Sequence, residues 1–250
     1  MSEIESSKPE LIIIDQLDSS VEFISAIKKA SPESKIVSFE DHGSGATVVD
    51  LLISDLYPNP NVDNSKQLTG ISHAILAPSF ETLERSRKLS PEVEEVLVLF
   101  GGTDPANLGL KALLALEEIK FQGRVKVIRG LGAKPITESF DLNIDYLSNV
   151  KNMPNQLSTA DLALSSAGRT ITELAQLGIP TICMAQNEKE LNHSHTTSSN
   201  GVVMLGLGTE VTQTELAEQI EALMKDFEKR KQLSSNAKKS VAGRSNKRIV

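Results

Sequence analysis

Residues 97–113 read LVLFGGTDPANLGLKAL and predict a strand, a glycine turn and the start of a helix. The apolar run ends at Gly101 and Gly102, which let a ligand approach the backbone closely. A helix N-terminus directly after such a turn offers free N–H groups and a favourable dipole to an anion such as phosphate. The alternative is a tight turn whose glycines only satisfy its geometry.

The residues that follow the glycines predict how this helix begins. Pro105 suits the first helical position, with Asp104 or Thr103 as the capping residue. A carboxylate aimed at the anion would weaken the site. We therefore expect the side chain of Asp104 to point back onto the helix amides.

A second stretch has the same design. Residues 161–182, DLALSSAGRTITELAQLGIPTI, predict a strand, a turn of small residues and a helix that opens with Arg169 and Thr170. Hydroxyls, amides and the guanidinium of this turn suit phosphate oxygens. Glu173, one turn further on, suits the hydroxyls of a ribose. In the alternative, Glu173 is solvated and the serines only cap the helix.

The third loop, residues 184–195, reads MAQNEKELNHSH and follows another predicted strand. Loops after parallel strands open on the same sheet edge, where ligands of such folds bind, so the three loops together predict a nucleotide pocket. His193 and His195 raise the alternative of a metal site, but no third histidine or carboxylate stands at ligand spacing. We expect no metal and no cofactor, since neither dinucleotide nor P-loop glycine motifs occur.

Strand and helix patterns alternate along the whole chain, which predicts an α/β fold with parallel sheets covered on both faces. The polar stretch before residue 96 predicts a boundary between domains at 1–89 and 90–250. Strands are expected at 11–14, 35–39, 74–76, 96–100, 125–128, 162–164 and 181–184. Helices are expected at 21–29, 106–119, 153–158 and 170–177, with one or two more at 214–236 and a further apolar element at 46–56.

Composition restricts the class of protein. The chain has 250 residues and a formal net charge of −7, which argues against a nucleic-acid-binding surface. A polar N-terminus and the lack of a long apolar window predict a cytoplasmic protein without a membrane span. Cys183 is the only cysteine and lies in a strand-like segment, so we expect a buried thiol.

These motifs resemble the C-terminal lobe of the GT-B superfamily. The segments LVLFGGTDPANL, ADLALSSAGRTITELAQLGIPTI and AQNEKELN are most similar to the UDP-sugar hydrolases of the pseudaminic acid pathway and the related spore-coat polysaccharide biosynthesis proteins. The segments LIIIDQ, VSFEDHGSGA and GISHAILAPSFE extend the resemblance upstream. Similar C-lobe motifs occur in the lipid-linked N-acetylglucosaminyltransferase of peptidoglycan synthesis. The resemblance implies two Rossmann-like domains of GT-B type, the N-terminal one incomplete.

The resemblance also implies a set of residues that bind a UDP-sugar. The diphosphate, the ribose and the sugar would be held by Gly101, Gly102, Thr103, Ser166, Ala167, Gly168, Arg169, Thr170, Glu173 and Asn187. Glu188 replaces the glutamine that follows Asn187 in the family. His73 and Ala77 stand where family members more often have tyrosine and arginine, so sugar recognition is expected to differ.

Family members begin with a strand and a glycine-rich loop that carries a histidine, the proposed base for water activation. No segment of this sequence matches that loop, so no catalytic residue is assigned. Three hypotheses follow: a UDP-sugar hydrolase that releases UDP and a free amino or deoxy sugar in surface polysaccharide or nonulosonic acid biosynthesis, a glycosyltransferase using a UDP-sugar donor, and a non-catalytic nucleotide-sugar-binding subunit. The incomplete first domain predicts an exposed sheet edge, and with it self-association or a partner chain.

Overall fold

The computed structural model describes residues 2–56, 58–83 and 88–242. It divides into two compact units, the first ending at Ile75 and the second beginning at Leu76. This division comes earlier than the boundary expected between residues 89 and 90. Leu76 and Phe80 are the reason, because both are buried in the core of the second unit.

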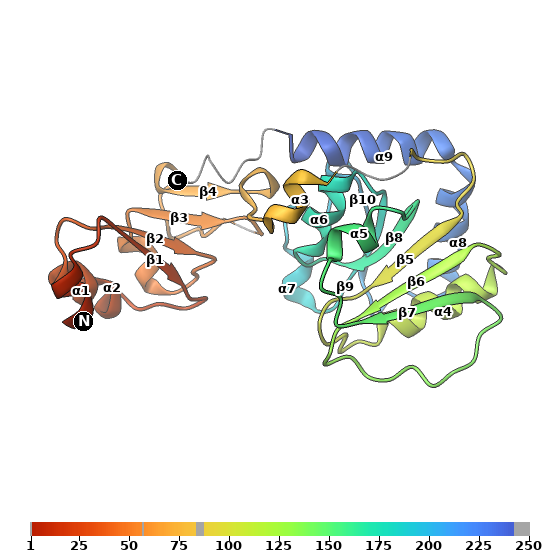
Figure 1. Cartoon of the computed structure of the whole chain (residues 1–250), viewed down its shortest axis with the longest axis horizontal. Coiled ribbons are helices and arrows are strands. Elements are labelled where there is room, and N and C mark those ends of the chain that lie inside the picture. Colours follow the sequence, from red (N-terminus) through yellow and green to blue (C-terminus); the bar gives the residue numbers. More distant parts are fainter. Residues whose placement is uncertain (1, 57, 84–87, 243–250) are drawn as a thin grey trace. The chain divides into compact units, whose positions relative to one another are not determined.

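The first unit is built around a four-stranded parallel sheet of order β1-β2-β3-β4 (Figure 1). Its elements are α1 (Ser2–Ser7), β1 (Leu11–Asp15), α2 (Val21–Ala30), β2 (Lys35–Phe39), η1 (Ser44–Val48), β3 (Leu51–Ser54), η2 (Asn64–Lys66), β4 (Gln67–Thr69) and η3 (Ile71–His73). The strand expected at 74–76 was wrong. Strand β4 lies earlier, in a turn-rich stretch, and its three residues are too few to show a periodicity.

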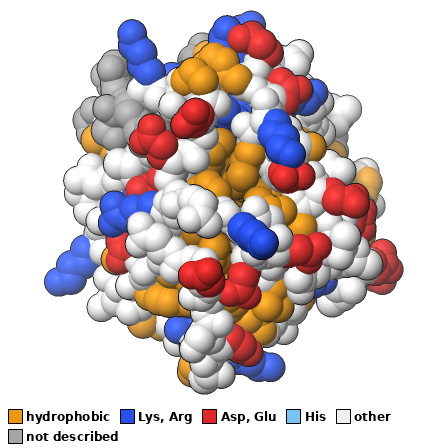
Figure 2. Space-filling view, turned by 90° about the vertical axis from the view of Figure 1, so that its right-hand side faces the viewer, with side chains coloured by type: hydrophobic (Ala, Val, Ile, Leu, Met, Phe, Trp, Pro, Cys, Tyr) orange, Lys and Arg blue, Asp and Glu red, His pale blue; other side chains and the backbone are white. Residues whose placement is uncertain are grey.

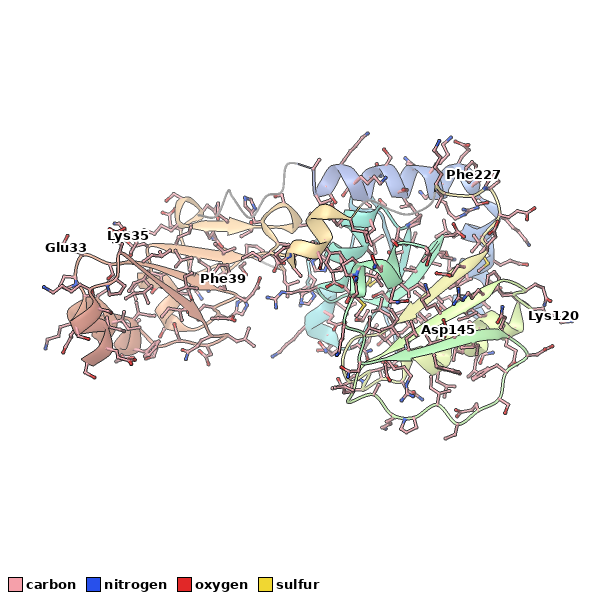
Figure 3. The ribbon with its side chains drawn as sticks, viewed as in Figure 1. Glu33, Lys35, Phe39, Lys120, Asp145 and Phe227 are labelled. Atoms are coloured by element: carbon pink, nitrogen blue, oxygen red, sulfur yellow. The ribbon has the colours of Figure 1, made fainter. Side chains whose placement is uncertain are left out.

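The two faces of this sheet differ. Ile24 and Ile27 of α2 pack on the face that carries Ile36 and other alternate strand residues. Ile13 of β1 points to the opposite face and is 61% exposed. Figure 3 labels Lys35 and Phe39, which are the ends of β2. Among the residues that the structure describes, β2 is the only strand that pairs with β1. Strand β1 is therefore an edge strand with an exposed apolar side chain.

The second unit contains a six-stranded parallel sheet of order β10-β9-β8-β5-β6-β7 (Figure 1). Its elements are α3 (Pro78–Thr82), β5 (Glu95–Leu99), α4 (Leu108–Glu118), β6 (Arg124–Arg129), β7 (Asn143–Ser148), α5 (Met153–Leu157), β8 (Leu162–Ser166), α6 (Thr170–Leu177), β9 (Thr181–Ala185), α7 (Glu188–Leu191), η4 (Ser198–Asn200), β10 (Val202–Leu207), α8 (Gln213–Lys225) and α9 (Phe227–Ser240). The expected strands 96–100, 125–128, 162–164 and 181–184 are confirmed as β5, β6, β8 and β9. Strands β7 and β10 were not predicted.

Helices cover both faces of the second sheet, as the alternating pattern predicted. Val96 and Val98 of β5 pack with α4 and α8 on one face, while Leu97 and Leu99 pack with α3, α5 and α6 on the other. Cys183 is fully buried, and burial raises the pKa of its thiol. The fold is thus α/β with parallel sheets, and the second unit is doubly wound.

The surface shown in Figure 2 mixes both signs of charge. Lysine and arginine side chains lie among aspartates and glutamates on this face, with hydrophobic patches between them. The described residues of this face therefore lack a continuous basic surface of the kind that binds nucleic acid. Among the helices of the described chain, none is long and apolar enough to span a bilayer.

Candidate functional site

The strand order of the second unit places two glycine-containing turns side by side. From β5 the chain continues to β6 and β7, and then returns to β8 on the other side of β5 before continuing to β9 and β10. Because the connections leave in opposite directions, a crevice opens at the carboxyl ends of β5 and β8, where ligands bind in open α/β sheets. The turn after β5 begins at Gly101, and the turn after β8 contains Gly168.

The first turn differs from its prediction in one respect. Helix α4 begins at Leu108 rather than at Pro105, because Asn107, its N-cap residue, adopts a left-handed conformation with φ of 54°. The expected direction of Asp104 is confirmed: its carboxylate accepts hydrogen bonds from the amides of Leu108 and Gly109, each at 2.8 Å. Asp104 thus caps the helix from outside its first turn.

The second turn begins its helix where the sequence predicted, at Thr170. The hydroxyl of Ser166 lies between the two turns. A Cβ atom added to Gly101 would lie 3.9 Å from Ser166 Oγ, and one added to Gly168 would lie 3.8 Å from the same atom. Two turns more than sixty positions apart in the sequence therefore meet around one hydroxyl.

The residues around this hydroxyl line a cavity of about 300 Å³. Nine of the ten predicted ligand-binding residues contribute to it: Gly101, Gly102, Thr103, Ser166, Gly168, Arg169, Thr170, Glu173 and Asn187. Ala167 does not, because it is fully buried and packs with Ile171 and Cys183. The oxygen of the Asn187 side chain accepts from the amides of Lys189 and Glu190 and so caps α7.

Glu173 lies at the junction of two cavities. It lines the cavity just described and a second one of about 360 Å³, whose walls include the apolar side chains of Leu131, Val150 and Met153. Burial raises the pKa of Glu173 to about 7. A carboxylate between a polar and a partly apolar cavity suits a ribose whose base and phosphates lie on either side of it.

Two further polar residues of the site were not among the predicted ligands. Gln186 donates to Asp104 Oδ1 at 2.8 Å and to the carbonyl oxygen of Phe100 at 3.1 Å, and so joins the turn after β5 to the loop after β9. Glu190 accepts from the amides of Gln186 at 2.8 Å and Ala167 at 3.3 Å. In the sequence, the only signal that Gln186 and Glu190 belong to the site is their position in a loop that follows a predicted strand.

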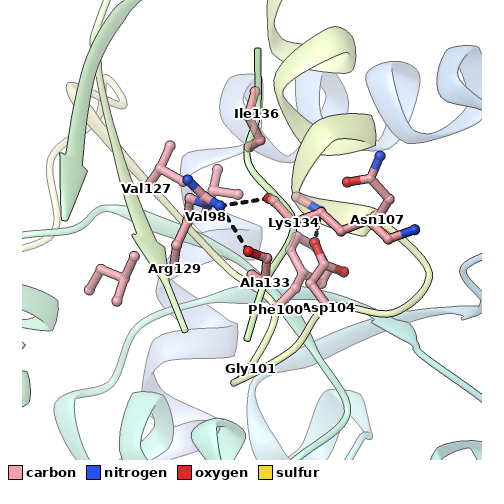
Figure 4. Close-up of a pocket in the computed structure, with 12 residues that line it drawn as sticks. Val98, Phe100, Gly101, Asp104, Asn107, Val127, Arg129, Ala133, Lys134 and Ile136 are labelled. Atoms are coloured by element: carbon pink, nitrogen blue, oxygen red, sulfur yellow. Dashed lines mark hydrogen bonds between the residues drawn. The ribbon is translucent and has the colours of Figure 1, made fainter. Parts of the chain in front are cut away.

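A small cavity of about 20 Å³ lies beside the first turn (Figure 4). Arg129 lines it and donates to the carbonyl oxygens of Ala133 at 3.0 Å and Lys134 at 2.6 Å. The space fits about one water molecule, so it is too small for a nucleotide. The guanidinium of Arg129 supports the loop after β6.

The glycines allow a matched test of the site. A Cβ atom at Gly102 would meet no atom within 4 Å, whereas one at Gly130 would lie 2.2 Å from the carbonyl oxygen of Gly102. Gly102→Ala should leave the free energy of unfolding within about 0.5 kcal/mol of wild type, yet weaken nucleotide binding by about tenfold, because its methyl group enters the cavity. Gly130→Ala should instead destabilise the fold by about 1–3 kcal/mol. Urea unfolding and nucleotide titration check both results, and equal effects of the two substitutions on stability would refute this view of the turn.

The histidine pair contacts the backbone of the turn after β8. His193 and His195 contact backbone carbonyl oxygens, and the described residues contain no group of three histidine, cysteine or acidic side chains that could hold a metal ion.

Comparisons with known proteins agree with this architecture. The chain is 25% identical over 258 residues to the spore coat polysaccharide biosynthesis protein SpsG of Bacillus subtilis, covering 98% of this chain and 76% of that protein. It is 28% identical over 185 residues to the UDP-N-acetylglucosamine–N-acetylmuramyl-(pentapeptide) pyrophosphoryl-undecaprenol N-acetylglucosamine transferase of Acetivibrio thermocellus, covering 63% of this chain and 48% of that protein.

Solved structures of glycosyltransferases share the fold. MurG of Acinetobacter baumannii superposes with a TM-score of 0.64 at 15% identity, covering 97% of this chain and 71% of that one. Alr3699/HepE of Anabaena, solved in complex with UDP and glucose, superposes with a TM-score of 0.60 at 15% identity, covering 99% of this chain and 78% of that one. At such identities the likeness supports the GT-B type of fold alone.

The model of the glycosyltransferase family 28 C-terminal domain matches residues 96–249, which include both glycine turns and Glu173. Since this match spans more than half of the 250 residues, the chain belongs to glycosyltransferase family 28 through its C-terminal domain.

Proposed function

We propose that the second unit binds a UDP-sugar at the carboxyl ends of β5 and β8. The observation that carries the proposal is the convergence of Gly101, Gly168 and Glu173 on adjoining cavities. The diphosphate would contact the two turns, Glu173 would accept from the ribose hydroxyls, and the uracil would enter the cavity beside Val150 and Met153. The structure of HepE with UDP and glucose supports the choice of nucleotide.

The reaction proposed for a bound UDP-sugar is cleavage of the bond between the anomeric carbon and the diphosphate oxygen. An oxygen nucleophile attacks the anomeric carbon, the C–O bond breaks, UDP leaves with the bonding electrons, and the nucleophile loses its proton. The turn amides, the N-terminus of α6 and Arg169 would stabilise the charge that develops on the diphosphate. These groups contribute equally whether the nucleophile is water or an acceptor hydroxyl.

The first hypothesis, a UDP-sugar hydrolase in surface polysaccharide or nonulosonic acid biosynthesis, takes water as the nucleophile. It rests on the resemblance to that branch and is compatible with the similarity to SpsG. The second, a glycosyltransferase, takes an acceptor hydroxyl and is favoured by membership of glycosyltransferase family 28. Both reactions are proposed for the cytoplasm.

One assay separates these hypotheses. Calorimetric titration of the chain with UDP should show saturable binding, after which UDP release from UDP-linked amino sugars is followed with and without an acceptor. Release without acceptor supports the hydrolase, and release only with acceptor supports the transferase. Binding without either release supports a nucleotide-sugar-binding subunit. Absence of UDP binding to folded protein would contradict all three.

We also propose that the first unit self-associates through the edge strand β1. Leu11 and Ile13 are 46% and 61% exposed there, and open strand edges pair readily with other chains. Wild-type protein should increase in mean mass with concentration, and Ile13→Asp should remain monomeric. Tyr146→Asp, at a 44% exposed position on the other sheet, is the control and should behave as wild type. Analytical ultracentrifugation checks this, and a monodisperse wild-type monomer at high concentration would refute it.

A further inference from the structure

We propose that His193 and His195 are positioning residues that set the direction of the peptide groups in the turn after β8 and thereby aim its amides at the diphosphate. The inference rests on the proposed function of this site. It assigns a role to the His-x-His pair, which neither the nucleotide-binding prediction nor a metal site explains.

Both imidazole rings contact backbone carbonyl oxygens of the turn. His193 Nδ1 lies 2.7 Å from the carbonyl oxygen of Ala167, and His195 Nε2 lies 3.1 Å from the same oxygen and 3.3 Å from that of Gly168. The two residues are 9% and 1% exposed, and neither lines the cavity of about 300 Å³. Because a carbonyl oxygen only accepts, each of these ring nitrogens carries its proton and donates.

The direction of the amides follows from peptide geometry. No cis peptide bond occurs in the described chain, and in a trans peptide the C=O and the N–H point in opposite directions. The carbonyl of Ala167 shares its peptide plane with the N–H of Gly168, and the carbonyl of Gly168 shares its plane with the N–H of Arg169. The carbonyl of Gly168 also accepts from the amide of Ile171 at 3.1 Å, and since the histidines contact both carbonyls, the two N–H groups point away from the histidines. Gly168 and Arg169 both line the cavity.

The same loop restrains the turn at a third group. Glu190 Oε2 accepts from the amide of Ala167 at 3.3 Å and from that of Gln186 at 2.8 Å. The loop after β9 therefore holds one N–H and two C=O groups of the turn. A peptide flip at Gly168, which this residue type permits, would break the histidine contacts and turn an amide away from the cavity.

The test compares variants that remove the donor with variants that retain it. His193→Leu and His195→Leu remove the N–H donor, whereas His193→Asn and His195→Gln keep an N–H at a similar reach. Each leucine variant should raise the Kd for UDP by about tenfold, as expected when an amide no longer donates to a phosphate oxygen. The asparagine and glutamine variants should stay within about threefold of wild type. Calorimetry on the full chain measures these constants.

Uridine distinguishes positioning from a structural role. It lacks phosphates, so its affinity, measured from amide shift changes in NMR spectra, should be the same in wild type and in all four variants. Leucine variants that bind UDP as tightly as wild type, or that lose uridine and UDP equally, would overturn the proposal. If wild-type protein fails to bind UDP, the proposed function fails and this inference with it.

A measurement on wild-type protein does not depend on how well the variants fold. The ¹⁵N shifts of the imidazole rings report which nitrogen carries the proton. We expect a proton on Nδ1 of His193 and on Nε2 of His195. An unprotonated nitrogen at either position would show that the ring does not donate to the turn, and would contradict the inference.

Discussion

Replacing Arg230 with methionine should lower the free energy of unfolding of the second unit by about 3–5 kcal/mol. Arg230 is fully buried in α9, and burial lowers the pKa of its guanidinium. It donates to the carbonyl oxygens of Leu223 at 3.1 Å and Met224 at 3.2 Å, at the end of α8, and to those of Ser90 at 2.8 Å and Pro91. Methionine fills a similar volume but leaves these four acceptors without their donor.

Lys231→Met is the matched control for this substitution. Lys231 neighbours Arg230 in sequence, and both charged groups lie within 5.5 Å of the centre of the Phe227 ring, which Figure 3 labels at the start of α9. Its side chain is 55% exposed and pairs with Glu228 at 3.0 Å, so its loss should change stability by less than about 0.5 kcal/mol. Urea unfolding followed by circular dichroism measures both variants. Similar stabilities for the two would contradict the role assigned to Arg230.

Glu173→Ala should weaken UDP binding at pH 8 by about 10- to 150-fold. An ionised carboxylate that accepts from the ribose hydroxyls contributes about 1.5–3 kcal/mol, the range for hydrogen bonds to charged groups. Because Glu173 lies between the two cavities, its removal should weaken binding of uridine as well as of UDP. Calorimetry on the variant, with circular dichroism to confirm its fold, provides the measurement. Unchanged uridine affinity would remove Glu173 from the ribose site.

The raised pKa of Glu173 gives this binding a pH dependence of known sign. With a pKa of about 7, the carboxyl group is mostly protonated at pH 6 and mostly ionised at pH 8. If the ionised form accepts from the ribose, uridine affinity should rise by about tenfold between these pH values. Uridine is the ligand of choice because phosphate groups titrate near pH 6 themselves. Glu173→Gln should abolish the rise, and a pH-independent wild type would contradict the assignment.

The sequence predicted those parts of the fold that rest on strong local patterns. Helix α6 has the predicted bounds, because Gly168 precedes it and Gly178 ends it in a left-handed conformation. Strand β5 is buried at every residue, so its apolar run was unambiguous. Strand β7 contains only exposed and half-buried residues in no regular alternation, and β4 has only three residues, so neither carried a signal above that of a turn.

The rest depended on contacts between distant segments. The division at Leu76 follows from its burial in the second core, and the start of α4 follows from the left-handed Asn107. Gln186 and the histidines act through backbone groups of other loops, at distances along the chain that no local pattern reveals. The predicted ligand residues came from turn chemistry and from the resemblance to the GT-B superfamily, and their role in binding stays a prediction.

The central claim is that the turns after β5 and β8 form one nucleotide site, and the most direct test is a UDP titration of isotope-labelled protein followed by ¹H–¹⁵N NMR. We expect saturable shifts that are largest at the amides of Gly101, Gly102, Gly168 and Thr170. A well-dispersed spectrum that shows no saturable shifts, or shifts confined to amides outside the two turns, would contradict the account.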